Sequence, residues 1–193
     1  MAHVIVSFMY YHLLHIPKTD IPGLKDFKGR YDKHDTIPEP HITLVFPFKD
    51  NSVTKEDLIN HIEKVLHKWR PFSVRVKGID KSWDHWMFLL LQQGNEDIIK
   101  LHDDLYTDIL KKHLRRDIEF IPHIGLGVFV KNDDYDLKNP QVTTFDEETY
   151  AAALMELSRL DIDFTTEVDS LTLIEVDNAF KHHKIIREFI IRD

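Results

Sequence analysis

One short phrase occurs twice in this chain, and its two copies restrict the folds that the chain can adopt. Pro40–Leu44 reads Pro-His-Ile-Thr-Leu, and Pro122–Leu126 reads Pro-His-Ile-Gly-Leu. Each copy leads into a run of β-branched and apolar residues, which favours a β-strand. The two histidines lie 82 positions apart. We therefore expect two related strands, one from each half of a duplicated fold.

The predicted elements around the two copies follow a similar order. His3 precedes His41 by 38 positions and His85 precedes His123 by the same number, which indicates one offset of 82 through that block. Apolar periodicity and capping residues predict the following elements. Strands are expected at 3–9, 41–48, 72–79, 85–91, 121–130, 168–176 and 185–191, and helices at 24–31, after the cap Thr54, after the cap Asn95, and at 147–158.

This order of elements predicts the fold class. A chain of 193 residues with 42% hydrophobic and 30% charged residues is ordinary for one globular domain. Residues 1–193 should form a single bilobal α+β domain built from duplicated β-α units. We expect two antiparallel sheets that face a central cleft, with helices on the outer faces.

Alternation of side chains along a strand predicts where the repeated residues point. In both copies the large apolar residues should face the helices. The other face would then carry the smaller or polar residues of each strand. These are His41, Thr43 and Val45 in the first copy, and His123, Gly125 and Gly127 in the second.

Two interpretations of the histidines follow. A lone histidine on a strand is commonly a solvated or hydrogen-bonded residue without a catalytic role. Two histidines at equivalent places on equivalent faces instead suit an acid and a base that act on one substrate. The duplicated phrase favours the second interpretation for His41 and His123.

The pattern resembles the 2H phosphoesterase superfamily, which includes the RNA 2′,3′-cyclic phosphodiesterases also described as 2′-5′ RNA ligases. That superfamily has two His-x-Thr/Ser-hydrophobic motifs in a bilobal α+β fold. The first copy matches the motif fully, and the second matches in all but the hydroxyl residue. The run Arg30–Asp32 before the first motif is also similar to the smaller bacterial members. The resemblance implies a cyclic phosphodiesterase or 2′-5′ RNA ligase-like hydrolase.

The chemistry of such an enzyme suits these residues. Opening a cyclic phosphate or cleaving a 2′-5′ phosphodiester requires a base for the attacking oxygen and an acid for the leaving oxygen. His41 and His123 can share these roles near neutral pH, and the sequence leaves open which is which. Thr43 can donate a hydrogen bond to a phosphate oxygen. This mechanism requires neither a metal nor another cofactor.

Gly125 departs from the motif. Loss of one hydroxyl donor would weaken charge stabilisation by about 2–4 kcal/mol if nothing compensates. A glycine here could bring its backbone N–H to the phosphate as a substrate-binding group, or make room for a bulkier substrate. It also suits a bulge or a close contact between strands, as does Gly127.

Other candidate residues lie near the repeated phrase. Arg30 and Tyr31 are expected to bind substrate, Arg30 by pairing with phosphate and Tyr31 by stacking on a base. The alternative is that both are surface groups. Trp83 and Trp86 could form a wall of the site, although Trp86 also suits core packing.

Composition excludes several classes of function. A net charge of −8 disfavours a long nucleic acid held through a broad basic surface. A small nucleotide or an RNA end remains as the substrate. The absence of cysteine excludes disulfides and thiol catalysis, and it fits a reducing compartment. The apolar start is interrupted by polar residues and lacks a basic lead-in, so we expect no signal peptide and no membrane span. We expect a cytoplasmic monomer.

Three competing functions remain. The pairs His12 with His15 and His182 with His183 lack a clear pattern of Cys, Asp or Glu ligands, which argues against a metal site and a metal-dependent hydrolase. A non-catalytic module that binds a nucleotide or phosphate ligand on the same fold is the main alternative. A purely structural protein would give both histidines no reason to lie off the packed face.

Overall fold

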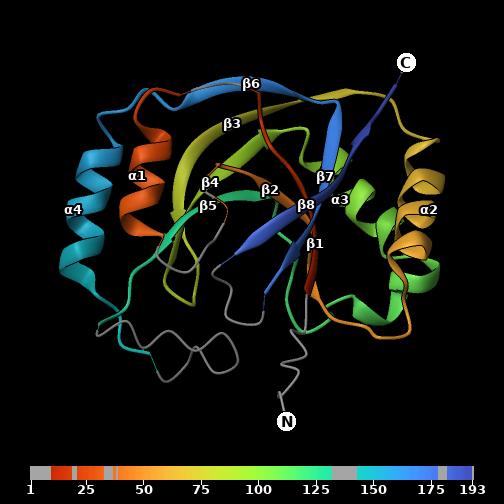
Figure 1. The fold of residues 1–193 in the computed structure, drawn as a ribbon. Coiled ribbons are helices and arrows are strands. Elements are labelled where there is room, and N and C mark those ends of the chain that lie inside the picture. Colours follow the sequence, from red (N-terminus) through yellow and green to blue (C-terminus); the bar gives the residue numbers. More distant parts are fainter. Residues whose placement is uncertain are drawn as a thin grey trace, which may run out of the picture.

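The chain folds into one antiparallel sheet with helices packed against it (Figure 1). The computed structural model describes residues 10–18, 21–32, 37, 39–131, 143–177 and 182–192. The described elements are β1 (Tyr10–His15), α1 (Leu24–Tyr31), β2 (Ile42–Phe48), α2 (Lys55–Leu66), β3 (Phe72–Lys81), β4 (Trp86–Gln93), α3 (Asn95–Leu105), the 3-10 helix η1 (Asp108–His113), β5 (His123–Val128), α4 (Glu147–Leu157), β6 (Asp163–Val168), β7 (Ser170–Val176) and β8 (His183–Ile190).

The eight strands run in the order β6-β3-β4-β5-β2-β1-β7-β8. The fold is α+β, as expected, but the expected division into two separate sheets is not confirmed. The repeated phrases lie on β2 and β5, the two central strands, which pair at Ile42 and Ile124. The central pair divides the sheet into two halves of four strands each, β6-β3-β4-β5 and β2-β1-β7-β8.

The helices form two pairs, and one helix of each pair packs on a central strand. α1 packs on β5 and against α4, whereas α3 packs on β2 and against α2. In Figure 1 the pairs α1 with α4 and α2 with α3 lie at opposite sides of the molecule. The main core lies between these helices and the sheet, and it includes the fully buried Phe27, Ile42, Ile62, Ile98 and Ile124.

β2 carries a bulge inside the first phrase. Thr43 pairs with Leu14 of β1, and Val45 pairs with Leu13, so Leu44 is the extra residue. A bulge of this kind reverses the side-chain alternation that follows it. Val45 therefore enters the main core with Leu13, and our expectation that it shares a face with Thr43 was wrong.

β5 carries the same bulge at the equivalent position. Gly125 pairs with Phe88 of β4, and Gly127 pairs with Met87, so Leu126 is the extra residue. The expectation that Gly127 shares a face with Gly125 was wrong for the same reason. The equivalent bulges show that the offset of 82 holds for β2 and β5.

The offset does not extend to the neighbouring strands. Leu13 on β1 corresponds to Met87 on β4, because each pairs across an equivalent bulge, and these residues are 74 positions apart. The single offset of 82 predicted from His3 and His85 is therefore wrong for these strands. His3 and the predicted strand at 3–9 lie outside the described residues, and the described strand that pairs with β2 is β1.

The N-caps of α2 and α3 explain why these helices begin where they do. Thr54 caps α2, and its hydroxyl accepts from the backbone N–H of Asp57 at 3.1 Å in a capping box, as expected. The N-cap of α3 is Gly94 rather than the expected Asn95. Gly94 has φ +79°, and a Cβ there would lie 2.6 Å from the carbonyl oxygen of Ser73. Only glycine fits that approach.

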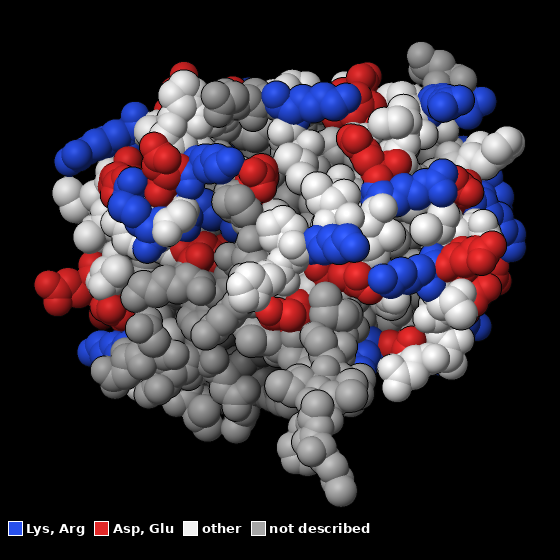
Figure 2. Space-filling model, in the orientation of Figure 1, with Lys and Arg blue, Asp and Glu red and all other residues white. Residues whose placement is uncertain are grey.

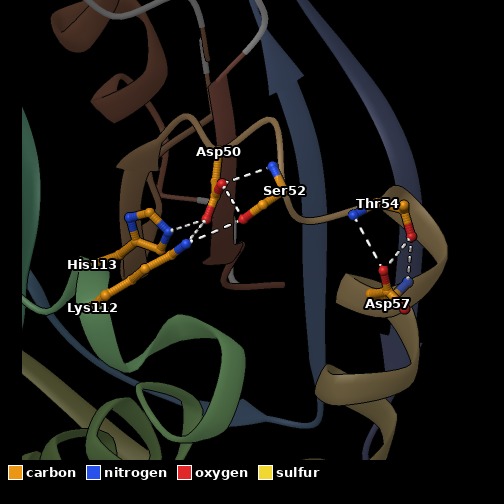
Figure 3. A network of polar contacts seen from close by, with 6 residues as sticks. All are labelled: Asp50, Ser52, Thr54, Asp57, Lys112 and His113. Carbon is orange, nitrogen blue, oxygen red and sulfur yellow. Dashed lines mark hydrogen bonds and ion pairs between the residues drawn. The ribbon is translucent and has the colours of Figure 1, made fainter.

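A polar network joins the end of β2 to η1 (Figure 3). One oxygen of Asp50 lies 3.0 Å from Nε2 of His113 and 2.5 Å from Nζ of Lys112, and the other accepts from the Ser52 hydroxyl at 2.6 Å. These donors, Lys112 first, hold the pKa of Asp50 well below its usual range.

Neither η1 nor β6 was expected from the sequence.

No helix in the described part of the chain has both the length and the apolar character needed to cross a membrane.

Candidate active site

The two central strands bring the repeated phrases side by side. Antiparallel pairing of Ile42 with Ile124 places His41 opposite Gly125 and Thr43 opposite His123. All four residues lie on the face opposite Ile42 and Ile124, which are in the helix-covered core. The strand register thus brings the predicted acid/base residues onto one face of adjacent strands.

Both histidines are held in the same way. Nδ1 of His41 lies 2.9 Å from the carbonyl oxygen of Glu39, and Nδ1 of His123 lies 2.6 Å from that of Ile121. A carbonyl only accepts, so each Nδ1 carries the proton and donates. Nε2 is then the ring atom of each neutral histidine that can take up or release a proton.

The electrostatic environment of His123 favours the neutral ring. Burial lowers its pKa below the ordinary value of 6.5, and repulsion from His41 lowers it further. The hydrogen bond to Ile121 and the charge of Asp84 act in the opposite direction. Because the charge of His41 contributes to this shift, the two rings lie close enough to interact electrostatically.

His12 is a third histidine beside this pair, and its position was not predicted from the sequence. It lies on β1, is 7% exposed, and places Nε2 3.2 Å from the hydroxyl oxygen of Thr43. Its ring meets that of His41 edge-on with the centroids 5.9 Å apart. No sequence pattern indicated this contact, because it forms between strands whose residues are 31 positions apart.

Gly125 lies against an aromatic side chain from β4. A Cβ at Gly125 would lie 3.9 Å from the six-membered ring of Trp86, which is an ordinary contact distance. On the same strand, Phe88 packs on His123 with the ring centroids 4.9 Å apart. Trp86 is half-buried, whereas Trp83 in the preceding turn is 63% exposed.

Arg30 and Tyr31 lie on α1, and the structure does not bring them to the histidines. The guanidinium of Arg30 pairs with Glu156 of α4, and the hydroxyl of Tyr31 donates to the same carboxylate at 3.1 Å. The backbone carbonyl of Tyr31 also lies 2.6 Å from where a Cβ of Gly127 would be. These contacts belong to the helix-covered side, and the expected role in substrate binding stays a prediction.

Two surface cavities lie elsewhere. The larger, about 880 Å³, lies beside η1 and is lined by Lys111, Lys112 and Arg116, among other residues. The smaller, about 160 Å³, lies near Lys25 and Glu39. Neither is lined by His41 or His123, so the expected central cleft is not confirmed.

The described surface shows mixed charge. On the face drawn in Figure 2, Lys and Arg lie beside Asp and Glu across the coloured surface instead of gathering in one broad patch. Within the described ranges, no group of three or more His, Cys, Asp or Glu side chains is arranged to hold a metal ion.

A family model for the 2′-5′ RNA ligase superfamily matches residues 17–179. A Geobacillus thermodenitrificans protein named "Putative phosphoesterase" is 24% identical over 110 residues, which is 56% of this chain and 62% of that protein. The chain thus spans less than two thirds of that relative. A Geobacillus kaustophilus protein with a similar name is 22% identical over 82% of each chain.

Solved structures share the fold. Escherichia coli LigT in its apo form aligns with a TM-score of 0.55 and 14% identity over 97% of this chain and 98% of LigT. A Thermus thermophilus protein aligns with a TM-score of 0.56 and 14% identity over 96% of this chain and 98% of that protein. LigT has also been solved with 3′-AMP and with ATP. At these identities the likeness shows a common fold.

Proposed function

The chain belongs to the 2′-5′ RNA ligase superfamily, and from that premise we propose that it is a metal-independent phosphoesterase with a two-histidine acid/base mechanism. The substrate would be a 2′,3′-cyclic phosphate or a 2′-5′ phosphodiester in a nucleotide or at an RNA end. The small nucleotides bound in LigT structures support a substrate of this size.

The observation that carries this proposal is that both imidazoles make the same hydrogen bond to the backbone. Each Nδ1 donates to the carbonyl of the residue two positions earlier, at 2.9 Å for His41 and 2.6 Å for His123. This arrangement suits an acid and a base on opposite sides of one phosphate, because it leaves Nε2 of each ring as the atom that can exchange a proton with the substrate.

The lowered pKa of His123 supports its assignment as the base. In this mechanism Nε2 of neutral His123 takes a proton from water as the water oxygen attacks phosphorus. The bond from phosphorus to the leaving ribose oxygen breaks, and protonated His41 supplies the proton for that oxygen. The products are a phosphomonoester and a restored ribose hydroxyl.

Thr43 would stabilise the charge that develops on phosphate. Thr43 lies opposite His123 by strand register, and its hydroxyl is the one motif hydroxyl left by the change to Gly125. Removal of a single preorganised donor typically costs about 10²–10³ in kcat. Thr43→Ala should therefore lower kcat by about that factor.

The direct test is hydrolysis of a 2′,3′-cyclic nucleotide and of an oligonucleotide with a 2′,3′-cyclic end, in the presence of EDTA. We expect turnover with a bell-shaped pH profile. His41→Ala and His123→Ala should each lower kcat by about 10²–10⁴. His67→Ala is the matched control, because His67 is an exposed histidine at the end of α2.

Two results would reject the proposal. Full activity in both single variants would show that the histidines are not the acid and base. Activity that is lost in EDTA and restored by a divalent cation would identify a metal-dependent hydrolase instead.

A second candidate function is a nucleotide- or phosphate-binding module without turnover. The observation that favours it is Gly125, which lacks the second phosphate-binding hydroxyl and lies against Trp86. Tight binding of 3′-AMP or a 2′,3′-cyclic nucleotide, measured by calorimetry, with no product formed from any cyclic or 2′-5′-linked substrate, would support this function over catalysis.

A further inference from the structure

His12 and Trp86 occupy equivalent places in the two halves of the sheet. On β1, Leu14 pairs with Thr43 across the bulge, and on β4, Phe88 pairs with Gly125. His12 precedes Leu14 by two residues, as Trp86 precedes Phe88, so both face the site. The two halves therefore present different side chains to the two motif positions.

His12 and Trp86 differ in polarity in the same way as the residues that they contact. Nε2 of His12 lies 3.2 Å from the hydroxyl oxygen of Thr43. Trp86 instead presents an aromatic ring to Gly125, where no hydroxyl exists. The half that keeps the hydroxyl thus has a nitrogen beside it, and the half that has lost the hydroxyl has an apolar wall.

We propose that His12 is a positioning residue that donates Nε2–H to the Thr43 hydroxyl oxygen and so directs the Thr43 proton toward the phosphate. This inference rests on the proposed function. A hydroxyl has one proton and two lone pairs. When His12 fills a lone pair, the Thr43 proton is left for a phosphate oxygen. If Nε2 of His12 accepted instead, that proton would be consumed and Thr43 could not donate to the phosphate.

Burial favours the hydrogen bond between His12 and Thr43 over hydrogen bonds to water. His12 is 7% exposed and Thr43 is partly buried, so water competes poorly for their contact. The edge-on contact with His41 also limits rotation of the His12 ring. Since a preorganised donor requires no reorientation during the reaction, the hydrogen bond would raise kcat more than it lowers KM.

The first test compares two replacements for His12 in the assay with a 2′,3′-cyclic nucleotide. His12→Phe keeps a planar ring but cannot donate, and we expect kcat to fall by about 10–100-fold with KM changed little. His12→Gln places an amide N–H near the position of Nε2, and we expect it to restore most of kcat. Equal losses in the two variants, with both folded by circular dichroism, would overturn the proposal.

The second test is a double-mutant cycle with Thr43→Ala. If His12 acts through the Thr43 hydroxyl, His12→Phe should cause little further loss of kcat once that hydroxyl is gone. Additive losses would show that His12 acts by another route and would overturn the inference.

The third test does not depend on activity. Long-range ¹H–¹⁵N spectra of histidine-labelled protein at neutral pH should show a proton on Nε2 of His12. A tautomer with the proton on Nδ1 alone would make Nε2 an acceptor and reject the inference. Absence of turnover by the unmodified protein would instead reject the proposed function, and the tautomer would still decide the role of His12.

Discussion

Gly125 and Gly127 differ in what a side chain would meet, although they are two residues apart. A Cβ at Gly125 has ordinary contacts with Trp86 at 3.9 Å, whereas one at Gly127 would lie 2.6 Å from the Tyr31 carbonyl oxygen at φ +155°. We therefore expect Gly125→Ser to fold normally. Its hydroxyl would restore the second motif and raise kcat on a 2′,3′-cyclic nucleotide by about 10-fold or more.

Gly127→Ser is the matched control. The same added hydroxymethyl group should lower the free energy of unfolding by about 1–3 kcal/mol, because the backbone of α1 must move and φ is strained. Urea unfolding of both variants measures this difference. A Gly125→Ser protein as unstable as Gly127→Ser would contradict the assignment of the two glycines to opposite faces.

The pKa of His123 provides a second prediction for single residues. Repulsion from His41 lowers this pKa and attraction to Asp84 raises it. His41→Ala should therefore raise the pKa of His123, and Asp84→Asn should lower it. An NMR titration of the His123 ring in each variant measures both directions. Shifts of the same sign in the two variants would show that the pairwise electrostatics are wrong.

Burial is the larger cause and keeps the pKa of His123 below 6.5. The base form of the ring thus persists to a lower pH than in an ordinary histidine. We expect the acidic limb of the kcat/KM profile, which reports the free enzyme, to lie below pH 6.5.

The limits of sequence analysis at the level of elements come from the bulges. Alternation along the strand correctly placed His41, Thr43, His123 and Gly125 on one face, because all four precede the extra residue. It failed for Val45, since apolar alternation does not encode the one-residue shift at Leu44. The four α-helices were easier to predict, because their apolar periodicity is local, although the cap of α3 is Gly94 and not Asn95.

Contacts between distant segments explain why the position of His12 and the relation between β1 and β4 were not predicted. His12 reaches the site only through the pairing of β1 with β2, whereas the first strand was expected at 3–9. The 74-residue relation between β1 and β4 has no signature in the sequence and follows from the strand register alone. The repeated phrase could identify two motif positions but not the side chains that neighbouring strands bring to them.

Helix α3 supports the bulge in β2. Nδ1 of His102 lies 2.8 Å from the carbonyl oxygen of Leu44, and the Tyr106 hydroxyl accepts from the backbone N–H of Phe46 at 3.0 Å. His102→Phe would leave the Leu44 carbonyl without this donor, at a cost of about 1–3 kcal/mol in the free energy of unfolding. Because Leu44 follows Thr43 directly, we also expect kcat to fall.

His61→Phe separates stability from function. Nε2 of His61 lies 2.8 Å from the carbonyl oxygen of Leu105, so it is also a buried histidine bonded to the backbone, but at the contact of α2 with α3. Urea unfolding should show a similar loss for His61→Phe, whereas kcat at a temperature where both variants are folded should change only in His102→Phe. Equal kcat values in the two variants would show that α3 does not position Thr43.

At the scale of the whole molecule, histidines also lie in the buried interior away from the candidate site. His15 is fully buried on β1, with Nδ1 2.9 Å from the carbonyl oxygen of Ser170, and His102 is buried between α3 and β2. Burial lowers the pKa of both below 6.5, as it does for His123. The folded protein thus holds three histidines neutral at a pH where the unfolded chain begins to protonate them.

This difference predicts how stability depends on pH. Below pH 6.5 the unfolded state binds more protons than the folded state, so the free energy of unfolding falls as pH falls. Each histidine contributes a slope of up to about 1.4 kcal/mol per pH unit between its folded pKa and 6.5. Urea unfolding at pH 7.5, 6.5 and 5.5 measures the effect, and His102→Gln should make the slope shallower because one titrating group is removed. Constant stability over that range would show that these histidines are solvated in the folded protein.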